Sequence, residues 1–129
     1  MFDNYIFTEN SFKNVKSDVK FSGFELKTLI PYYRGIPYSM IHDICIEVDG
    51  MPIDRNKIKF SADGEDWFTL SELETVTSYK WEYGTQGIIR VEQDGGLLAG
   101  QHEVSLTVIV RTAYIPVPIG GTRTRIITV

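Results

Sequence analysis

The chain has 129 residues, a length that predicts one domain with one hydrophobic core. Its composition, 43% hydrophobic and 23% charged, is that of a globular protein and excludes wholesale disorder. A formal net charge of -4 argues against nucleic acid as a partner, and a single cysteine excludes an internal disulfide. No apolar run is long enough to span a membrane. We therefore expect one soluble, cytoplasmic domain over residues 1–129.

A period of two in hydrophobicity predicts β-strands along the whole chain, separated by turns such as Asp49-Gly50 and Asp63-Gly64. A change of phase at Ser22-Gly23 predicts a β-bulge. Ser71 and Glu74 have the spacing of a capping box and predict one helical turn after Leu70. The expected strands are Phe2–Thr8, Val19–Leu29, Ile44–Val48, Lys57–Phe60, Trp67–Leu70, Thr75–Tyr83, Gly87–Glu92, His102–Tyr114 and Arg123–Val129. This pattern predicts an all-β fold, an antiparallel two-sheet β-sandwich or jelly-roll-like domain.

The residues that most often carry chemistry do not form a recognisable site in the sequence. The two histidines, His42 and His102, are 60 positions apart and no metal-ligand spacing links them to Cys45, so we predict no metal site. His102 is expected to be a solvated edge residue, and Cys45 a small buried side chain of its strand. No catalytic residue can be assigned on this basis.

Two other features have a structural and a functional interpretation. The acidic turn Asp63–Asp66 lacks the alternating spacing of a calcium-binding loop, so we favour a hairpin turn. Trp67 and Trp81 could stack on a sugar, but each lies in an alternating strand, where an aromatic side chain usually belongs to the core.

The segment Ile30–His42 differs from the other predicted loops in composition. It holds two prolines, which restrict the backbone, and side chains typical of interface hot spots. We favour a partner-contact or substrate-proximal surface over a plug that closes one end of the sandwich. The candidate residues are Tyr32, Tyr33, Arg34, Ile36, Tyr38 and His42. Arg34 is expected to pair with a partner carboxylate or to hydrogen-bond a polar group of a substrate.

A second apolar, proline-bearing segment, Tyr114–Thr122, also reads as a loop. Exposed apolar loops often mark a partner surface, and here the contact and plug interpretations remain equally open. Its candidate residues are Ile115, Val117 and Ile119.

Several sequence blocks resemble the small β-subunit of bacterial C-glycoside deglycosidases, and the resemblance extends from end to end. The most specific block is Pro-Tyr-Tyr-Arg-Gly-Ile-Pro at residues 31–37. The others are the start Met-Phe-Asp-Asn-Tyr-Ile, the Val-Asp-Gly turn, Glu-Thr-Val-Thr near Trp-Glu-Tyr-Gly, and Gly-Gly-Leu followed by Gly-Gln-His-Glu-Val.

The resemblance implies a division of labour between two subunits in a higher-order hetero-oligomer. A larger α-subunit, similar to TIM-barrel sugar-phosphate isomerases, would hold a divalent metal, typically manganese, and the general base. The complex would cleave the carbon–carbon bond between a 3-oxo-sugar and an aromatic aglycone such as a flavonoid, by β-elimination. The present chain would hold no cofactor and would be inactive alone. The alternative is a stand-alone carbohydrate-binding or accessory β-sandwich module.

Overall fold

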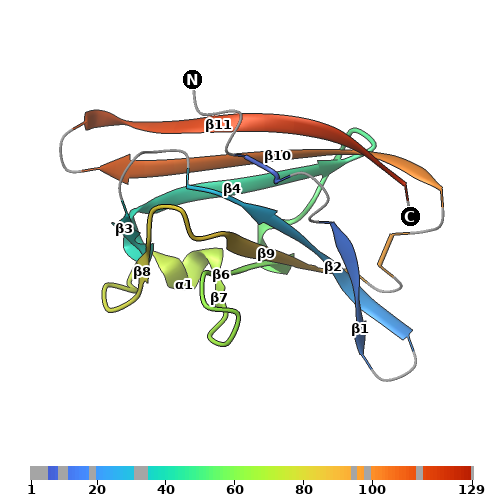
Figure 1. Ribbon diagram of the computed structural model, residues 1–129, viewed down its shortest axis with the longest axis horizontal. Coiled ribbons are helices and arrows are strands. Elements are labelled where there is room, and N and C mark those ends of the chain that lie inside the picture. The colour runs from blue at the N-terminus through green and yellow to red at the C-terminus, as the bar shows by residue number, and fades with distance from the viewer. Residues whose placement is uncertain are drawn as a thin grey trace.

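The computed structural model describes residues 6–8, 12–17, 20–30, 35–93, 96–97, 100–112 and 115–128. Figure 1 shows two antiparallel sheets that lie one over the other. The first has the order β1-β2-β9-β6-β7, the second has the order β11-β10-β4-β5, and β3 pairs with β8. All the strand pairs are antiparallel. The expected all-β, sandwich-like fold is therefore confirmed.

The strands of the first sheet are β1 (Lys13–Ser17), β2 (Lys20–Thr28), β6 (Ile58–Ser61), β7 (Phe68–Thr69) and β9 (Gly87–Glu92). Those of the second are β4 (Ile41–Val48), β5 (Met51–Pro52), β10 (Gln101–Thr112) and β11 (Ile115–Thr128). The pair at one end is β3 (Ile36–Pro37) with β8 (Lys80–Trp81). Within the described residues, the helical elements are α1 (Leu70–Leu73) and the short 3-10 turns η2 (Tyr38–Met40) and η3 (Arg55–Lys57). None of the described helices is long and apolar enough to cross a membrane.

Alternating side chains from both sheets form the core between them. The second sheet contributes Val104, Leu106, Val108 and Val110 of β10, all fully buried as the sequence pattern predicts. From the first sheet, every second residue of β9 points inward, including Ile89 and Val91. Burial of these side chains fixes which face of each strand is outward, and so which residues remain available at the surface.

The predicted bulge near Gly23 is confirmed. Opposite β1, Gly23 pairs with Val15 and Phe21 pairs with Lys16, which leaves Ser22 as the extra residue on β2. A Cβ atom on Gly23 would lie 1.9 Å from the carbonyl oxygen of Val91. Only glycine therefore permits β2 to approach β9 this closely.

The helical turn is present, but its cap lies two residues before the predicted position. Thr69 and Glu72 form the capping box in place of Ser71 and Glu74. The Thr69 hydroxyl accepts from the Glu72 amide at 3.3 Å, and the Glu72 carboxylate accepts from the Thr69 amide at 2.8 Å. Starting at Leu70 buries both Leu70 and Leu73, which explains why this register is chosen.

The segment Tyr114–Thr122 was wrongly predicted to be a loop, since β11 begins at Ile115 and runs as one strand to Thr128. Proline removes a backbone donor and is excluded from central strands, which is the basis of the loop prediction. In the order observed, β11 is at the edge of its sheet, where Pro116 and Pro118 are tolerated.

Other expected strands change in extent. Thr75–Tyr83 contracts to the two residues of β8, and β1, β3 and β5 were not predicted. The expected strand Phe2–Thr8 lies mostly outside the described residues, and its last three residues are not in a strand.

Candidate functional site

The structure separates the candidate residues of Ile30–His42 into different environments. Tyr32, Tyr33 and Arg34 lie outside the described residues. Ile36 and Tyr38 are 4% and 1% exposed and belong to the core, so they are not surface contacts as predicted. For these two side chains the plug interpretation is the correct one.

Tyr38 is buried because it completes an aromatic cluster at this end of the sandwich. Its ring lies 5.2 Å from Phe60, 5.9 Å from Phe68 and 5.6 Å from Tyr79 between centroids. Its hydroxyl accepts from the backbone amide of Ala62 at 2.8 Å. Burial raises the pKa of the phenol, which therefore stays protonated. This tyrosine supports the fold beneath the surface.

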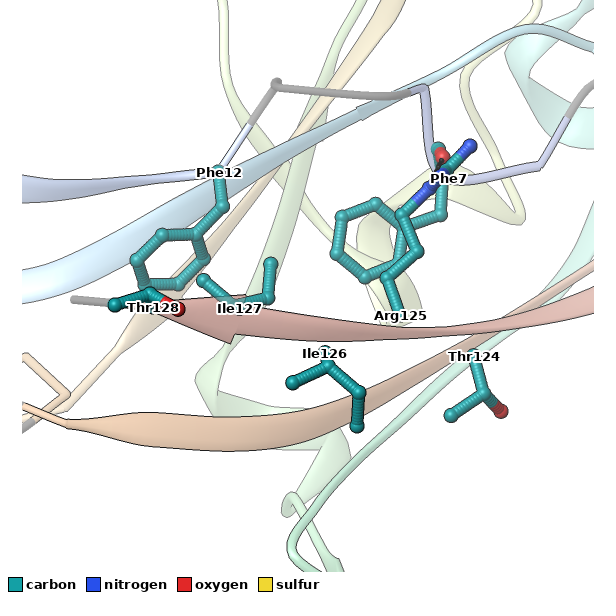
Figure 2. Close-up of a pocket in the computed structure, with 7 residues that line it drawn as sticks. All are labelled: Phe7, Phe12, Thr124, Arg125, Ile126, Ile127 and Thr128. Atoms are coloured by element: carbon teal, nitrogen blue, oxygen red, sulfur yellow. Dashed lines mark hydrogen bonds between the residues drawn. The ribbon is translucent and has the colours of Figure 1, made fainter.

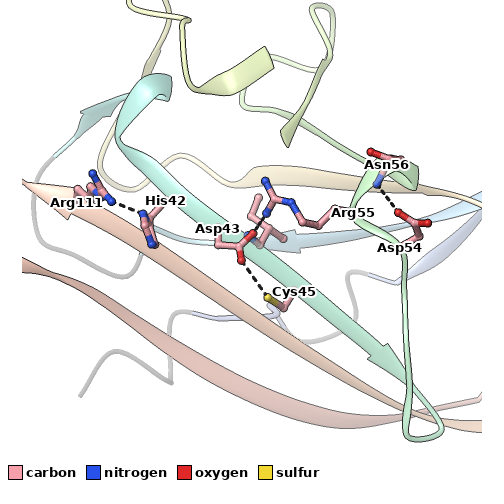
Figure 3. Close-up of polar contacts among 8 residues, drawn as sticks. His42, Asp43, Cys45, Asp54, Arg55, Asn56 and Arg111 are labelled. Atoms are coloured by element: carbon pink, nitrogen blue, oxygen red, sulfur yellow. Dashed lines mark hydrogen bonds and ion pairs between the residues drawn. The ribbon is translucent and has the colours of Figure 1, made fainter. Parts of the chain in front are cut away.

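His42, in contrast, is exposed at the beginning of β4. Val110 pairs with Ile41 and Ile109 pairs with Asp43, so His42 is the extra residue of a β-bulge. Such bulges often redirect a side chain at the rim of a sheet. Here the bulge brings the imidazole to Arg111 of β10, whose Nε donates to His42 Nδ1 at 2.9 Å (Figure 3).

Arg111 is the donor of this hydrogen bond, and His42 Nδ1 is the acceptor. Sequence analysis did not find Arg111. The contact depends on the pairing of β10 with β4 and on the bulge at His42, and local sequence patterns contain neither.

His42 and Arg111 line a small hollow together with Ser39, Ile41 and Glu74, and we call this the His42 hollow. Its volume is about 300 Å³. The side chains come from η2, β4, β10 and the C-cap of α1, so four elements meet here. Arg111 and Glu74 are both exposed and Ile41 is buried. The hollow therefore combines a cation, an anion and an apolar wall at the end of the sandwich.

A second group of polar contacts follows β4 from Asp43 (Figure 3). The Arg55 guanidinium forms an ion pair with the Asp43 carboxylate, and the Cys45 thiol lies 3.5 Å from the same carboxylate. Cys45 was predicted to be buried but is exposed, because Ile44 and Ile46 take the inward positions. Desolvation, followed by the charge of Asp43, raises the pKa of the Cys45 thiol, and this disfavours the nucleophilic thiolate.

A larger hollow of about 580 Å³ lies between the N-terminal segment and the end of β11 (Figure 2). Phe7, Phe12 and Ile127 provide apolar walls. Arg125 Nε donates to the Phe7 carbonyl oxygen at 2.6 Å, and this ties β11 to the N-terminal segment. Of the three candidates in the second apolar segment, Ile119 is partly buried against the core. Nothing is described of the side chains of Ile115 and Val117.

His102 lies away from His42 and has a local structural role. Its Nδ1 is 2.8 Å from Asp49 Oδ2, and its side chain is 16% exposed, so the predicted solvated edge position is wrong. The hydrogen bond from His102 and a second from the Glu103 amide lower the pKa of Asp49. Together they fix the turn between β4 and β5 against β10.

The acidic turn after β6 is a hairpin turn, as predicted, and joins β6 to β7. One oxygen of Asp63 accepts from the amides of Glu65 and Asp66 and from the Ser61 hydroxyl. Across the described part of the chain, no group of three or more His, Cys, Asp and Glu side chains could hold a metal ion.

The two tryptophans differ in exposure. Trp81 is fully buried, as predicted for a core residue. Trp67 is half-buried, and the Arg90 guanidinium lies 4.1 Å from its ring centroid. One face of Trp67 is therefore covered by a cation.

Comparison with known proteins gives three findings. A family model described as C-glycoside deglycosidase beta subunit matches residues 2–114, and β11 lies beyond this match. The C-glycoside deglycosidase beta subunit of Eubacterium cellulosolvens is 29% identical over 106 residues, which cover 81% of this chain and 71% of the relative. The 3'-dehydrocarminate deglycosidase beta subunit of a Microbacterium species is 31% identical over 98 residues, which cover 74% of this chain and 71% of the relative.

Proposed function

The chain belongs to the family of C-glycoside deglycosidase β-subunits, and on this premise we propose that it is the β-subunit of a heteromeric carbon–carbon lyase. The complex cleaves the bond between a 3-oxo-sugar and an aromatic, flavonoid-like aglycone. The observation that carries the proposal is the match of the family model to residues 2–114. Two curated relatives that are themselves β-subunits of deglycosidases support it.

In the proposed reaction the 3-oxo group acidifies the proton at C2 of the sugar. A general base removes that proton, the electron pair forms an enolate, and the bond from C1 to the aglycone breaks. The aglycone carbon takes up a proton as it leaves. We assign the base and a divalent metal, manganese in the proposal, to a TIM-barrel-like α-subunit. The described residues of this chain do not fit a metal site, and no step is assigned to one here.

The proposed contribution of this chain is to dock on the α-subunit and to complete the complex without catalytic residues of its own. The designation β-subunit implies at least one other kind of subunit. We place the complex in the cytoplasm. The segment 31–34 remains a candidate contact for the partner or the substrate, with Arg34 as its cation.

A stand-alone carbohydrate-binding module is the less favoured function. Such modules commonly stack exposed aromatic rings on sugar faces, yet Trp81 is buried and Arg90 covers one face of Trp67. Trp81 therefore cannot stack on a sugar, and Arg90 leaves at most one face of Trp67 for such a contact.

Co-expression with the product of a neighbouring gene that encodes a TIM-barrel metalloprotein tests the assembly. We expect the two chains to co-purify and to elute together in size exclusion as a complex larger than either chain. Separate elution of two folded chains would contradict the proposal. Binding of the isolated chain to glycans, without any such complex, would favour the carbohydrate-binding module.

A further inference from the structure

The cation of the His42 hollow lacks a carboxylate partner within the described chain. Arg111 Nε donates to His42 Nδ1 at 2.9 Å. By comparison, Arg55 is paired with Asp43, and Arg90 with Glu25. No described carboxylate lies within ion-pair distance of Arg111, although Glu74 lines the same hollow. The two terminal nitrogens of Arg111 therefore form a cationic fork whose N–H groups have no carboxylate acceptor among the described residues.

The bulge at His42 also gives this fork a defined orientation. An exposed arginine usually loses side-chain entropy when a partner fixes it. Here Nε is already held by an imidazole that β4 presents from a bulge, so part of that cost is met before binding. When Nε is already occupied, the two terminal nitrogens of a guanidinium still lie side by side. In this geometry they can donate two parallel hydrogen bonds to one carboxylate.

The hollow itself restricts what can reach the fork. Its volume of about 300 Å³ is at the lower limit of ligand pockets and accommodates a single side chain. Ile41 forms an apolar wall, and the Ser39 hydroxyl can donate or accept. The neighbouring acid Asp43 is occupied by Arg55, so it does not compete for Arg111.

We propose that Arg111, oriented by His42, is a docking contact for a carboxylate side chain of the partner subunit. The inference rests on the proposed function, because it requires that the chain assembles with a partner. Arg111 supplies the charge and the fork, and His42 is a positioning residue that acts through Arg111. Glu74 lines the same hollow, and its like charge repels an incoming carboxylate.

Substitutions of Arg111 and Glu74 distinguish a carboxylate from other occupants. The quantity measured is the dissociation constant between the purified subunits. Arg111→Gln should weaken assembly about 30-fold, on the scale of an interface hot spot. Glu74→Gln should tighten assembly about threefold, since it removes a like charge. The control Lys57→Gln, which removes an exposed cation elsewhere, should change the constant by less than about twofold.

Substitution of His42 tests its positioning role. His42→Leu removes the acceptor for Arg111 Nε and should weaken assembly about fivefold, on the scale of one lost hydrogen bond. His42→Gln keeps an acceptor oxygen and should recover most of this loss. Equal effects of the two variants would overturn the positioning role.

The remaining outcomes separate the inference from the proposed function. If Arg111→Gln leaves assembly unchanged and raises KM, the fork contacts substrate and the docking contact is overturned. If both Arg111→Gln and Glu74→Gln weaken binding, the occupant uses a donor as well as an acceptor and is not a carboxylate. If the wild-type chains form no complex, the proposed function fails and the inference fails with it.

Discussion

At the scale of single residues, Asp63 shows how a carboxylate that resembles a ligand can serve the backbone instead. The amides of Asp66 and Glu65, followed by the Ser61 hydroxyl, lower the pKa of Asp63. The capping carboxylate of Glu72 and the turn carboxylate of Asp49 have lowered pKa values for related reasons. In each case hydrogen bonds in the folded protein stabilise the ionised carboxylate.

These lowered pKa values predict a loss of stability in acid. A carboxyl group whose pKa is lower in the folded state stabilises the fold fully above its unfolded pKa, about pH 4. That contribution disappears as the pH falls through the lower, folded pKa. We therefore expect the free energy of unfolding, measured by urea titration, to decrease from about pH 4 towards pH 2.

Asp63→Asn should flatten this acid dependence, because the amide oxygen can still accept from the backbone but does not titrate. The measurement is the slope of unfolding free energy against pH for the variant and the wild type. The same slope for both proteins would show that Asp63 does not contribute to the acid sensitivity.

The exposure of individual side chains was harder to predict than the strands to which they belong. Cys45 is exposed because Ile44 and Ile46 take the inward positions of β4. The alternation of Ile44 and Ile46 with Cys45 and Glu47 indicates this phase, but Cys45 was assigned to the core from its residue type. Ile36 and Tyr38 lie in a segment whose composition is typical of protein interfaces, yet both side chains are buried in the core. Composition alone does not distinguish an aromatic residue that closes the core from one that contacts a partner.

At the scale of elements, the close approach of β2 and β9 depends on one glycine. Gly23 pairs with Glu92, and an added Cβ would meet the Val91 carbonyl oxygen at 1.9 Å. A backbone oxygen cannot move aside as a flexible side chain can. The two strands would have to separate, at a cost in ladder hydrogen bonds and packing.

Gly23→Ala should therefore lower the free energy of unfolding by about 3 kcal/mol, as measured by urea denaturation. Gly50→Ala is the control, because no atom lies within 4 Å of its added Cβ. The positive φ of 81° at Gly50 predicts a smaller cost, about 1 kcal/mol. A loss below that of the control would show that the strands tolerate the methyl group.

Sequence patterns predicted the strands in which apolar and polar residues alternate regularly. They missed strands whose composition is tolerated only because of their position in the sheet. β9 has the predicted bounds, and β10 buries the four predicted residues. β11 was predicted only in part because its prolines are compatible with a strand only at a sheet edge. Strand order depends on long-range pairing, which local periodicity does not contain.

At the scale of the whole molecule, the His42 hollow exists only because the sandwich brings distant segments together. His42 and Arg111 are 69 positions apart, and their contact requires both the pairing of β4 with β10 and the bulge. Sequence analysis identified His42 from its neighbours in the chain and could not identify Arg111. The resemblance to β-subunits, by contrast, rested on local blocks and was confirmed by the family match.

We propose that this chain functions only as one subunit of a carbon–carbon lyase. The most direct measurement is release of the aromatic aglycone from a 3-oxo-C-glycoside in the presence of manganese. It is made with this chain alone, with the α-subunit alone, and with the two combined. We predict no release by this chain alone and rapid release by the combined subunits. Release by this chain alone, or a combined rate no greater than that of the α-subunit, would contradict this proposed function.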